Sequence, residues 1–256
     1  VGELVHLSRS VVSGQRLTAL RALTLVLERR RDAIEGKSGS QTSPCPNKLP
    51  NDLPKVLMVC LQSDVSGIMC QSIQAVYAWL VPTCFVECQG ANPTYRSHEA
   101  WPFVYHAQKL EGDFSTSAVA DPYGDTFLAA EKDGEETLEG LLVKLSEQDP
   151  VRWCMRCGIL ESFARILRTG ISVLPVGIAR DALDTLSYMA SHSIPVARAM
   201  WTHPQLINVI QHTFLEGNGS VLHNAIRFIR TLAQSDREIA QKVAQDQGLA
   251  DTVKRY

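Results

Sequence analysis

Two stretches of this sequence align with each other without a gap, and no other feature constrains the fold as strongly. Residues 182–210 match residues 225–253 at an offset of 43 positions. Few residues are identical, but small residues meet small residues and large apolar residues meet large apolar residues. The equivalent pairs are Ala182 and Ala225, Leu183 and Ile226, Leu186 and Ile229, Met189 and Leu232, Ala197 and Ala240, and Leu206 and Leu249.

The apolar residues in the first part of each copy recur at steps of one and three, which places them on one face of a helix. A helix of this kind must bury its apolar face, and stacking the next copy against it does so. The offset falls in the range of about 40–47 residues that HEAT and armadillo repeats use. The sequence therefore predicts an all-α fold, an armadillo/HEAT-like helical repeat (α-solenoid).

A third, degraded copy precedes these two. The segment 158–163 resembles the segment 248–253, which begins the last helix of the second copy. The region from Val151 onward is therefore predicted to hold two helices that are broken near Gly158. In the first copy, Pro204 is predicted to open the equivalent helix, which runs to Leu215, because its missing N–H costs nothing in a first turn.

Composition divides the rest of the chain. Nine acidic residues and one base lie between Glu111 and Glu139, which predicts a mobile acidic insert. The linker that follows the first helices is rich in glycine, serine and proline. The predicted segments are 1–35, helical; 36–54, linker; 55–110, helical repeat region; 111–137, acidic insert, partly disordered; and 138–256, armadillo-like repeats.

Net charge and apolar content limit the classes of partner. The net charge of −2 argues against a broad basic surface for nucleic acid, so no direct nucleic-acid binding is expected. The longest apolar run, residues 56–61, is too short to span a bilayer, and residues 1–10 do not resemble a signal peptide. The start at Val1 rather than at methionine suggests a fragment or a domain cut from a longer chain. Seven irregularly spaced cysteines favour a reducing compartment.

Some motifs suggest catalysis, but their neighbouring residues or predicted secondary structure do not fit a catalytic site. Gly36-Lys37-Ser38 resembles the end of a phosphate-binding loop, but that loop needs glycine where Arg31 stands and must follow a strand. The CxxC motif of Cys154 and Cys157 lies in a helical stretch, so we interpret both as buried, reduced thiols. The histidines match no zinc or triad pattern. We therefore expect neither an enzyme nor a bound cofactor or metal.

The basic run Arg29-Arg30-Arg31 closes the first long helix and has two interpretations. Cations in a last turn interact favourably with the helix dipole, by a few tenths to about 1 kcal/mol. The alternative is a binding site for an anionic ligand.

Several blocks resemble the RNA polymerase II-associated protein 1 family. The run ELVHLSRS at residues 3–10, followed by QRLTAL at residues 15–20, is similar to the closing part of that family's signature C-terminal block. Residues 65–76, residues 92–102 with Tyr95 and Trp101, and the acidic insert have counterparts as well. Residues 182–215 and 225–244 resemble the family's terminal helical repeats.

The resemblance implies a non-catalytic scaffold or assembly factor that shuttles between nucleus and cytoplasm. Its expected partners are RNA polymerase II subunits and chaperone or GTPase assembly factors, and its expected roles are polymerase assembly, nuclear import and transcription. The alternative is another armadillo-type adaptor, such as a tethering or ubiquitin-ligase regulatory scaffold. Asn208, Gln211 and His212 are predicted to face a partner. The alternative is that these side chains simply face solvent.

Overall fold

The computed structural model describes residues 1–34, 49–83, 85, 149–170, 174–215, 221–246 and 248–251. Every regular element in these ranges is a helix, so the predicted all-α helical repeat is confirmed. The acidic insert at 111–137 and most of the linker at 36–54 lie outside the described residues. The counterparts proposed around Tyr95 and Trp101 lie outside them too.

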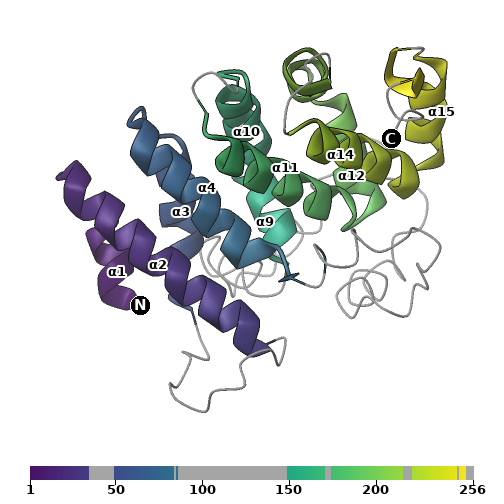
Figure 1. Ribbon diagram of the computed structural model, residues 1–256. Helices are drawn as coiled ribbons and strands as arrows, with labels where there is room; N and C mark the ends of the chain where they lie inside the picture. The colour runs from purple at the N-terminus through teal and green to yellow at the C-terminus, as the bar shows by residue number, and fades with distance from the viewer. Residues whose placement is uncertain are drawn as a thin grey trace, which may run out of the picture.

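Four long helices lie side by side in chain order and form a row across the molecule (Figure 1). They are α2 (Ser13–Ile34), α4 (Ser66–Leu80), α11 (Val176–Ala190) and α14 (Leu222–Ser235). Helix α4 contacts both α2 and α11, and α11 contacts both α4 and α14. We call these four helices the long-helix layer.

Short helices pack against the long-helix layer and complete the repeated units. They are α1 (Gly2–Leu7), α3 (Leu53–Leu61), α9 (Pro150–Arg156), α10 (Ile159–Leu167), α12 (Ile194–Thr202), α13 (Leu206–Ile210), the π-helical turn η4 (Gln211–Leu215) and α15 (Arg237–Gln245). Two units have three successive helices each, namely α9–α10–α11 and α12–α13/η4–α14. Three helices per unit is the armadillo pattern.

Equivalent positions of the two aligned copies are buried alike in the structure. Ala182 and Ala225 are both completely buried at equivalent points of α11 and α14. Leu186 and Ile229 are likewise buried, and so are Leu206 in α13 and Leu249 in the last described turn. The apolar residues form one continuous core from α1 to the last described turn. Each helix therefore hides its apolar face only because the next unit covers it.

Gly158 breaks the chain between α9 and α10, as the degraded copy predicts. Its φ of 72° lies in the left-handed region, which glycine enters without a steric penalty. Helix α9 has ended at Arg156, and α10 begins at Ile159.

Helix α13 begins at Leu206, later than the prediction that Pro204 opens it. The Nδ1 atom of His203 accepts a hydrogen bond from the backbone N–H of Leu206 at 3.2 Å. The imidazole therefore satisfies a donor at the helix start, which the helix itself leaves without a partner.

Candidate functional site

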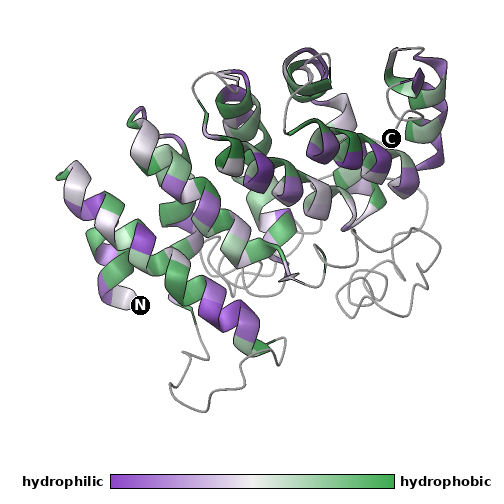
Figure 2. Ribbon diagram, in the orientation of Figure 1, coloured by the Kyte–Doolittle hydropathy of each residue, from purple (hydrophilic) through white to green (hydrophobic). Residues whose placement is uncertain are grey.

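Helix α4 lies between α2 and α11 in the long-helix layer and carries a stripe of half-buried residues. Its buried side carries Ile68, Ile73 and Val76. The stripe repeats at intervals of three and four and consists of the half-buried residues Cys70, Gln71, Gln74 and Tyr77. In Figure 2, hydrophilic residues also gather at the C-terminal end of α2 and recur on α11 and α14.

Tyr77 is the point where side chains from neighbouring helices meet. The guanidinium carbon of Arg31, on α2, lies 5.5 Å from the centre of the Tyr77 ring. The same guanidinium donates a hydrogen bond from Nη1 to the carbonyl of Val81 at 3.2 Å. Arg31 therefore ties the end of α2 to the end of α4, a more specific role than the helix-dipole interaction alone.

Ionisable groups from three helices act on the Tyr77 phenol. Burial raises its pKa, the positive charges of Arg31 and Arg227 lower it, and the negative charge of Asp181 raises it. Residues of α2, α11 and α14 therefore lie close enough to the α4 tyrosine to interact with it electrostatically.

Asp181 on α11 is the most perturbed carboxyl of this surface. Burial raises its pKa to about 6, Glu28 adds to the rise, and Arg180 and Arg31 oppose it. A half-buried carboxylate beside a second carboxylate is disfavoured in its charged form. Asp181 thus titrates near neutral pH, where exposed aspartates are fully ionised.

One turn further along α11, Asp184 joins α11 to α14. Its Oδ1 accepts a hydrogen bond from Asn224 Nδ2 at 2.7 Å and forms an ion pair with Arg227. The Asp184 side chain is 4% exposed and the Arg227 side chain 14% exposed. Burial lowers the pKa of Arg227, the Tyr77 phenol raises it and the charge of Arg180 lowers it further. We call Arg31, Tyr77, Asp181, Asp184 and Arg227 the central cluster.

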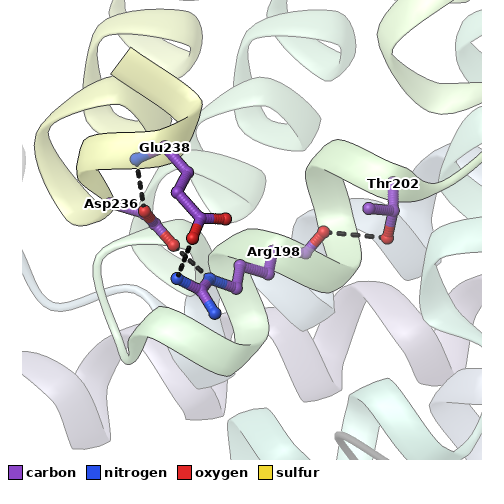
Figure 3. A network of polar contacts seen from close by, with 4 residues as sticks. All are labelled: Arg198, Thr202, Asp236 and Glu238. Atoms are coloured by element: carbon purple, nitrogen blue, oxygen red, sulfur yellow. Dashed lines mark hydrogen bonds and ion pairs between the residues drawn. The ribbon is translucent and has the colours of Figure 1, made fainter. Parts of the chain in front are cut away.

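A second polar network joins α12 to the start of α15 (Figure 3). Asp236 caps α15 by accepting a hydrogen bond from the N–H of Glu238 at 2.7 Å, and it also pairs with Arg198 Nε. Arg198 Nη2 lies 3.5 Å from the Glu238 carboxylate. The hydrogen bond from Arg198 lowers the pKa of Asp236 below its ordinary value, although burial opposes it. Because Asp236, Arg198 and Glu238 already pair with one another, we infer that this network stabilises the fold.

Asp149 repeats this arrangement in an earlier unit. It caps α9 by accepting a hydrogen bond from the N–H of Arg152 at 2.9 Å, and His192 Nε2 lies 3.2 Å from the same carboxylate. Burial alone raises the pKa of Asp149, but His192 and Arg152 together lower it below its ordinary value. Both caps therefore hold one unit to the next.

The predicted partner-facing residues lie outside the long-helix layer, on α13 and on η4, which packs against α14. Asn208 and His212 are exposed on α13 and η4, and Gln211 between them is half-buried. The Asn208 amide donates to the carbonyl of Pro204 at 3.4 Å, one turn earlier. Their contact with a partner stays a prediction.

Part of the central cluster has a signal in the sequence, in the register of the two aligned copies. Asp184 and Arg227 occupy the same position in the two aligned copies, 43 residues apart. Equivalent positions of neighbouring repeats lie beside each other once the repeats stack. Opposite charges at such a pair therefore predict an ion pair between units. Arg31 and Tyr77 lie outside the aligned copies, so the 43-residue register does not predict where they lie.

Of the two thiols in the CxxC motif, Cys154 matches the interpretation as a buried cysteine, and Cys157 matches it in part. Cys154 is completely buried, and burial raises its pKa well above the ordinary value. Burial also raises the pKa of Cys157, which is half-buried. Within the described ranges, no group of three or more histidine, cysteine, aspartate or glutamate side chains is arranged to hold a metal ion. Among the same residues, no helix is both long and apolar enough to cross a membrane.

Comparison with known proteins gives one sequence relative and several structural likenesses. No family model matches the chain. RNA polymerase II-associated protein 1 of Bos taurus is 23% identical over 269 residues, which cover 99% of this chain and 19% of that protein. The chain therefore spans about a fifth of the length of the curated relative it matches.

Two of the similar solved structures are designed or engineered proteins. A designed armadillo repeat protein is 11% identical, with a TM-score of 0.40, and the match covers 98% of this chain and 96% of that one. An engineered protein of known crystal structure is 16% identical, also with a TM-score of 0.40, over 99% of this chain and 93% of that one.

Proposed function

We propose that this chain is a non-catalytic scaffold that binds RNA polymerase II subunits together with chaperone or GTPase assembly factors. In this role it supports polymerase assembly, nuclear import and transcription, and it moves between nucleus and cytoplasm. The observation that carries the binding role is the central cluster, where polar side chains of four successive long helices meet and Arg31, Tyr77 and Asp181 stay half-buried. The similarity to bovine RNA polymerase II-associated protein 1 supports the choice of partner.

The chemistry of the central cluster supports binding rather than catalysis. Asp181 has the raised pKa that acid–base residues often show. Its described neighbours, however, are arginines, a tyrosine and another carboxylate, and Asp184 and Arg227 are already paired between helices. A surface of half-buried arginine and tyrosine is typical of the residues that contribute most to protein–protein affinity.

We place a second contact on the α13–η4 segment, at Asn208, Gln211 and His212. The exposure of Asn208 and His212 supports this proposal, since a partner reaches them without unfolding the unit. The triple substitution to alanine tests it. The proposal requires a measurable loss of partner recovery together with an unchanged thermal unfolding midpoint.

Affinity purification from cell extract with mass spectrometry tests the function as a whole. The tagged chain is expected to recover polymerase subunits together with chaperones or small GTPases. Recovery of ubiquitin-ligase or vesicle-tethering components without polymerase would replace the proposal with the adaptor alternative. Repeating the purification after deletion of residues 111–124 tests whether the acidic insert contributes to partner binding. An unchanged set of partners would show that it does not.

A further inference from the structure

Helix α2 has a solvent-exposed side that its neighbours in the long-helix layer do not have. On its buried side, Leu20 and Leu23 are completely buried. On its other side, exposed residues follow one another at intervals of three and four, and they are Thr18, Arg21, Leu25 and Arg29. Side chains at these intervals lie on one face of a helix. We call these four residues the α2 stripe.

The place of α2 at the end of the row explains why the stripe is exposed. Helix α4 packs between α2 and α11, and α11 packs between α4 and α14, whereas α2 has a long helix on one side only among the described elements (Figure 1). No residue from Ile68 to Leu80 of α4 is exposed, and none from Asp181 to Ala190 of α11. At the other end of the row, α15 packs against α14. The cover that a neighbouring unit provides is therefore missing from one side of α2.

The α2 stripe places an apolar side chain between two positive charges. Leu25 is 57% exposed, and Arg21 and Arg29 lie one turn before it and one turn after it. The Cα atoms of the two arginines are about 12 Å apart along the helix axis. In the part of the chain that the structure describes, neither guanidinium forms an ion pair or a hydrogen bond. The two carboxylates of α2, Glu28 and Asp32, are half-buried. Both arginines of the stripe are therefore free to bind a partner.

We propose that the α2 stripe binds an acidic amphipathic helix of a protein partner, with an apolar side chain on Leu25 and carboxylates on Arg21 and Arg29. Arginine binds a carboxylate through two parallel hydrogen bonds, and Leu25 loses water when an apolar side chain covers it. A helix with glutamate, leucine and glutamate at intervals of four supplies all three groups on one face. This contact adds to the proposed function, because Thr24 and Arg31, which contact α4, lie on a different side of α2.

Two other occupants match the α2 stripe less well. A second copy of this chain would bring arginines against arginines, and like charges across an interface are unfavourable. A nucleic acid would use the positive charges, but its phosphate backbone would offer no apolar side chain to Leu25. An acidic helix uses the apolar and the charged parts of the stripe together.

Fluorescence anisotropy of labelled helical peptides, titrated with the whole chain, tests this proposal. Each peptide is rich in alanine and has about 20 residues, because shorter helices are marginal in water. On one face, at intervals of four, the peptides carry glutamate, leucine and glutamate; lysine, leucine and lysine; or glutamate, serine and glutamate. We expect the glutamate–leucine peptide to bind, the lysine peptide not to bind, and the serine peptide to bind roughly threefold to tenfold more weakly than the first.

The apolar contact is tested by Leu25→Ala. This variant is expected to weaken binding of the glutamate–leucine peptide roughly threefold to tenfold. Val59→Ala shortens another exposed apolar side chain, on α3, and is the matched control that should leave binding unchanged. Both side chains are exposed, so circular dichroism is expected to show the same unfolding midpoint for the two variants.

The charged contacts are tested by combining Arg21→Gln with Arg29→Gln. The double variant is expected to weaken binding of the glutamate–leucine peptide about tenfold or more. Arg168→Gln combined with Arg237→Gln removes the same charge from exposed positions on other helices and is the matched control. Added salt should weaken binding to the unmodified chain, because it screens exposed charges.

Each control defines a result that would overturn the proposal. Leu25→Ala that binds the glutamate–leucine peptide like Val59→Ala would do so, and so would an arginine double variant that binds like its control. A dimer in sedimentation that Leu25→Ala dissociates would assign the α2 stripe to a second copy instead. A polyuridine strand that binds more tightly than the peptide, and equally well to Leu25→Ala, would assign the stripe to nucleic acid.

Discussion

Asp236 is the N-cap of α15, and its carboxylate accepts hydrogen bonds from both the N–H of Glu238 and the guanidinium of Arg198. Replacing it by alanine removes a helix cap and leaves Arg198 without its buried partner. Loss of a cap alone costs about 0.5–2 kcal/mol. We expect Asp236→Ala to lower the free energy of unfolding by about 2 kcal/mol in urea titrations. Glu238→Ala removes the exposed contact to the same arginine and is expected to cost less than about 0.5 kcal/mol.

The two helix caps, Asp236 and Asp149, also make the stability of the chain depend on pH. The pKa of Asp236 and of Asp149 is lower in the folded chain than its ordinary value. Their stabilisation is complete above the ordinary aspartate pKa and is lost as the pH falls through the folded-state values. The unfolding midpoint of Asp149→Asn should therefore change less below pH 4 than that of the unmodified chain. Equal acid sensitivity of the two proteins would contradict this assignment.

Asp181 changes the stability with pH in the opposite direction to the two caps, because its pKa is raised to about 6 in the folded chain. Folding then favours the protonated form, so stability falls as the pH rises from about 4 to about 6. Asp181→Asn is expected to stabilise the chain by about 1–2 kcal/mol at pH 7 and by almost nothing at pH 4. Urea unfolding at both values checks this, with the exposed Asp64→Asn as the control. A destabilised variant at pH 7 would show that Asp181 forms a net favourable ion pair.

Among the elements, the break between α9 and α10 depends on one backbone conformation. Gly158 has φ of 72°, and a Cβ added there lies 3.3 Å from the Glu161 carboxylate. We expect Gly158→Ala to destabilise the chain by about 1 kcal/mol. Gly177→Ala, in the first turn of α11 with open space around it, is expected to be neutral or stabilising. Similar losses in both variants would mean that the left-handed turn is unimportant.

The elements were predictable from the sequence where a repeat or a glycine marked them. The apolar positions of α11 and α14, such as Leu183 and Ile226, follow from the 43-residue register, and the break near Gly158 follows from the degraded copy. The central cluster was not predicted, because Arg31 and Tyr77 are separated by a linker and look solvated in their own helices. Only the stacking of α4 on both α2 and α11 brings them together with Asp181.

For the whole molecule, stability comes from contacts between successive units. Leu186 is completely buried in α11, a helix that packs against both α4 and α14. We expect Leu186→Ala to cost about 2–5 kcal/mol, because it leaves a cavity that the packed helices cannot close. Leu25→Ala, at a position that is 57% exposed on α2, should cost less than about 0.5 kcal/mol. Circular dichroism during urea unfolding measures both.

We propose that the stacked units present the long-helix layer to a protein partner. Hydroxyl-radical footprinting with purified RNA polymerase II tests it most directly, because it reports the accessibility of each side chain in the complex. We predict that oxidation of Tyr77 and Cys70 on α4 falls when the polymerase is added, while oxidation of Trp201 on α12 stays the same. Unchanged oxidation of Tyr77 and Cys70, with protection of Trp201 in their place, would contradict it.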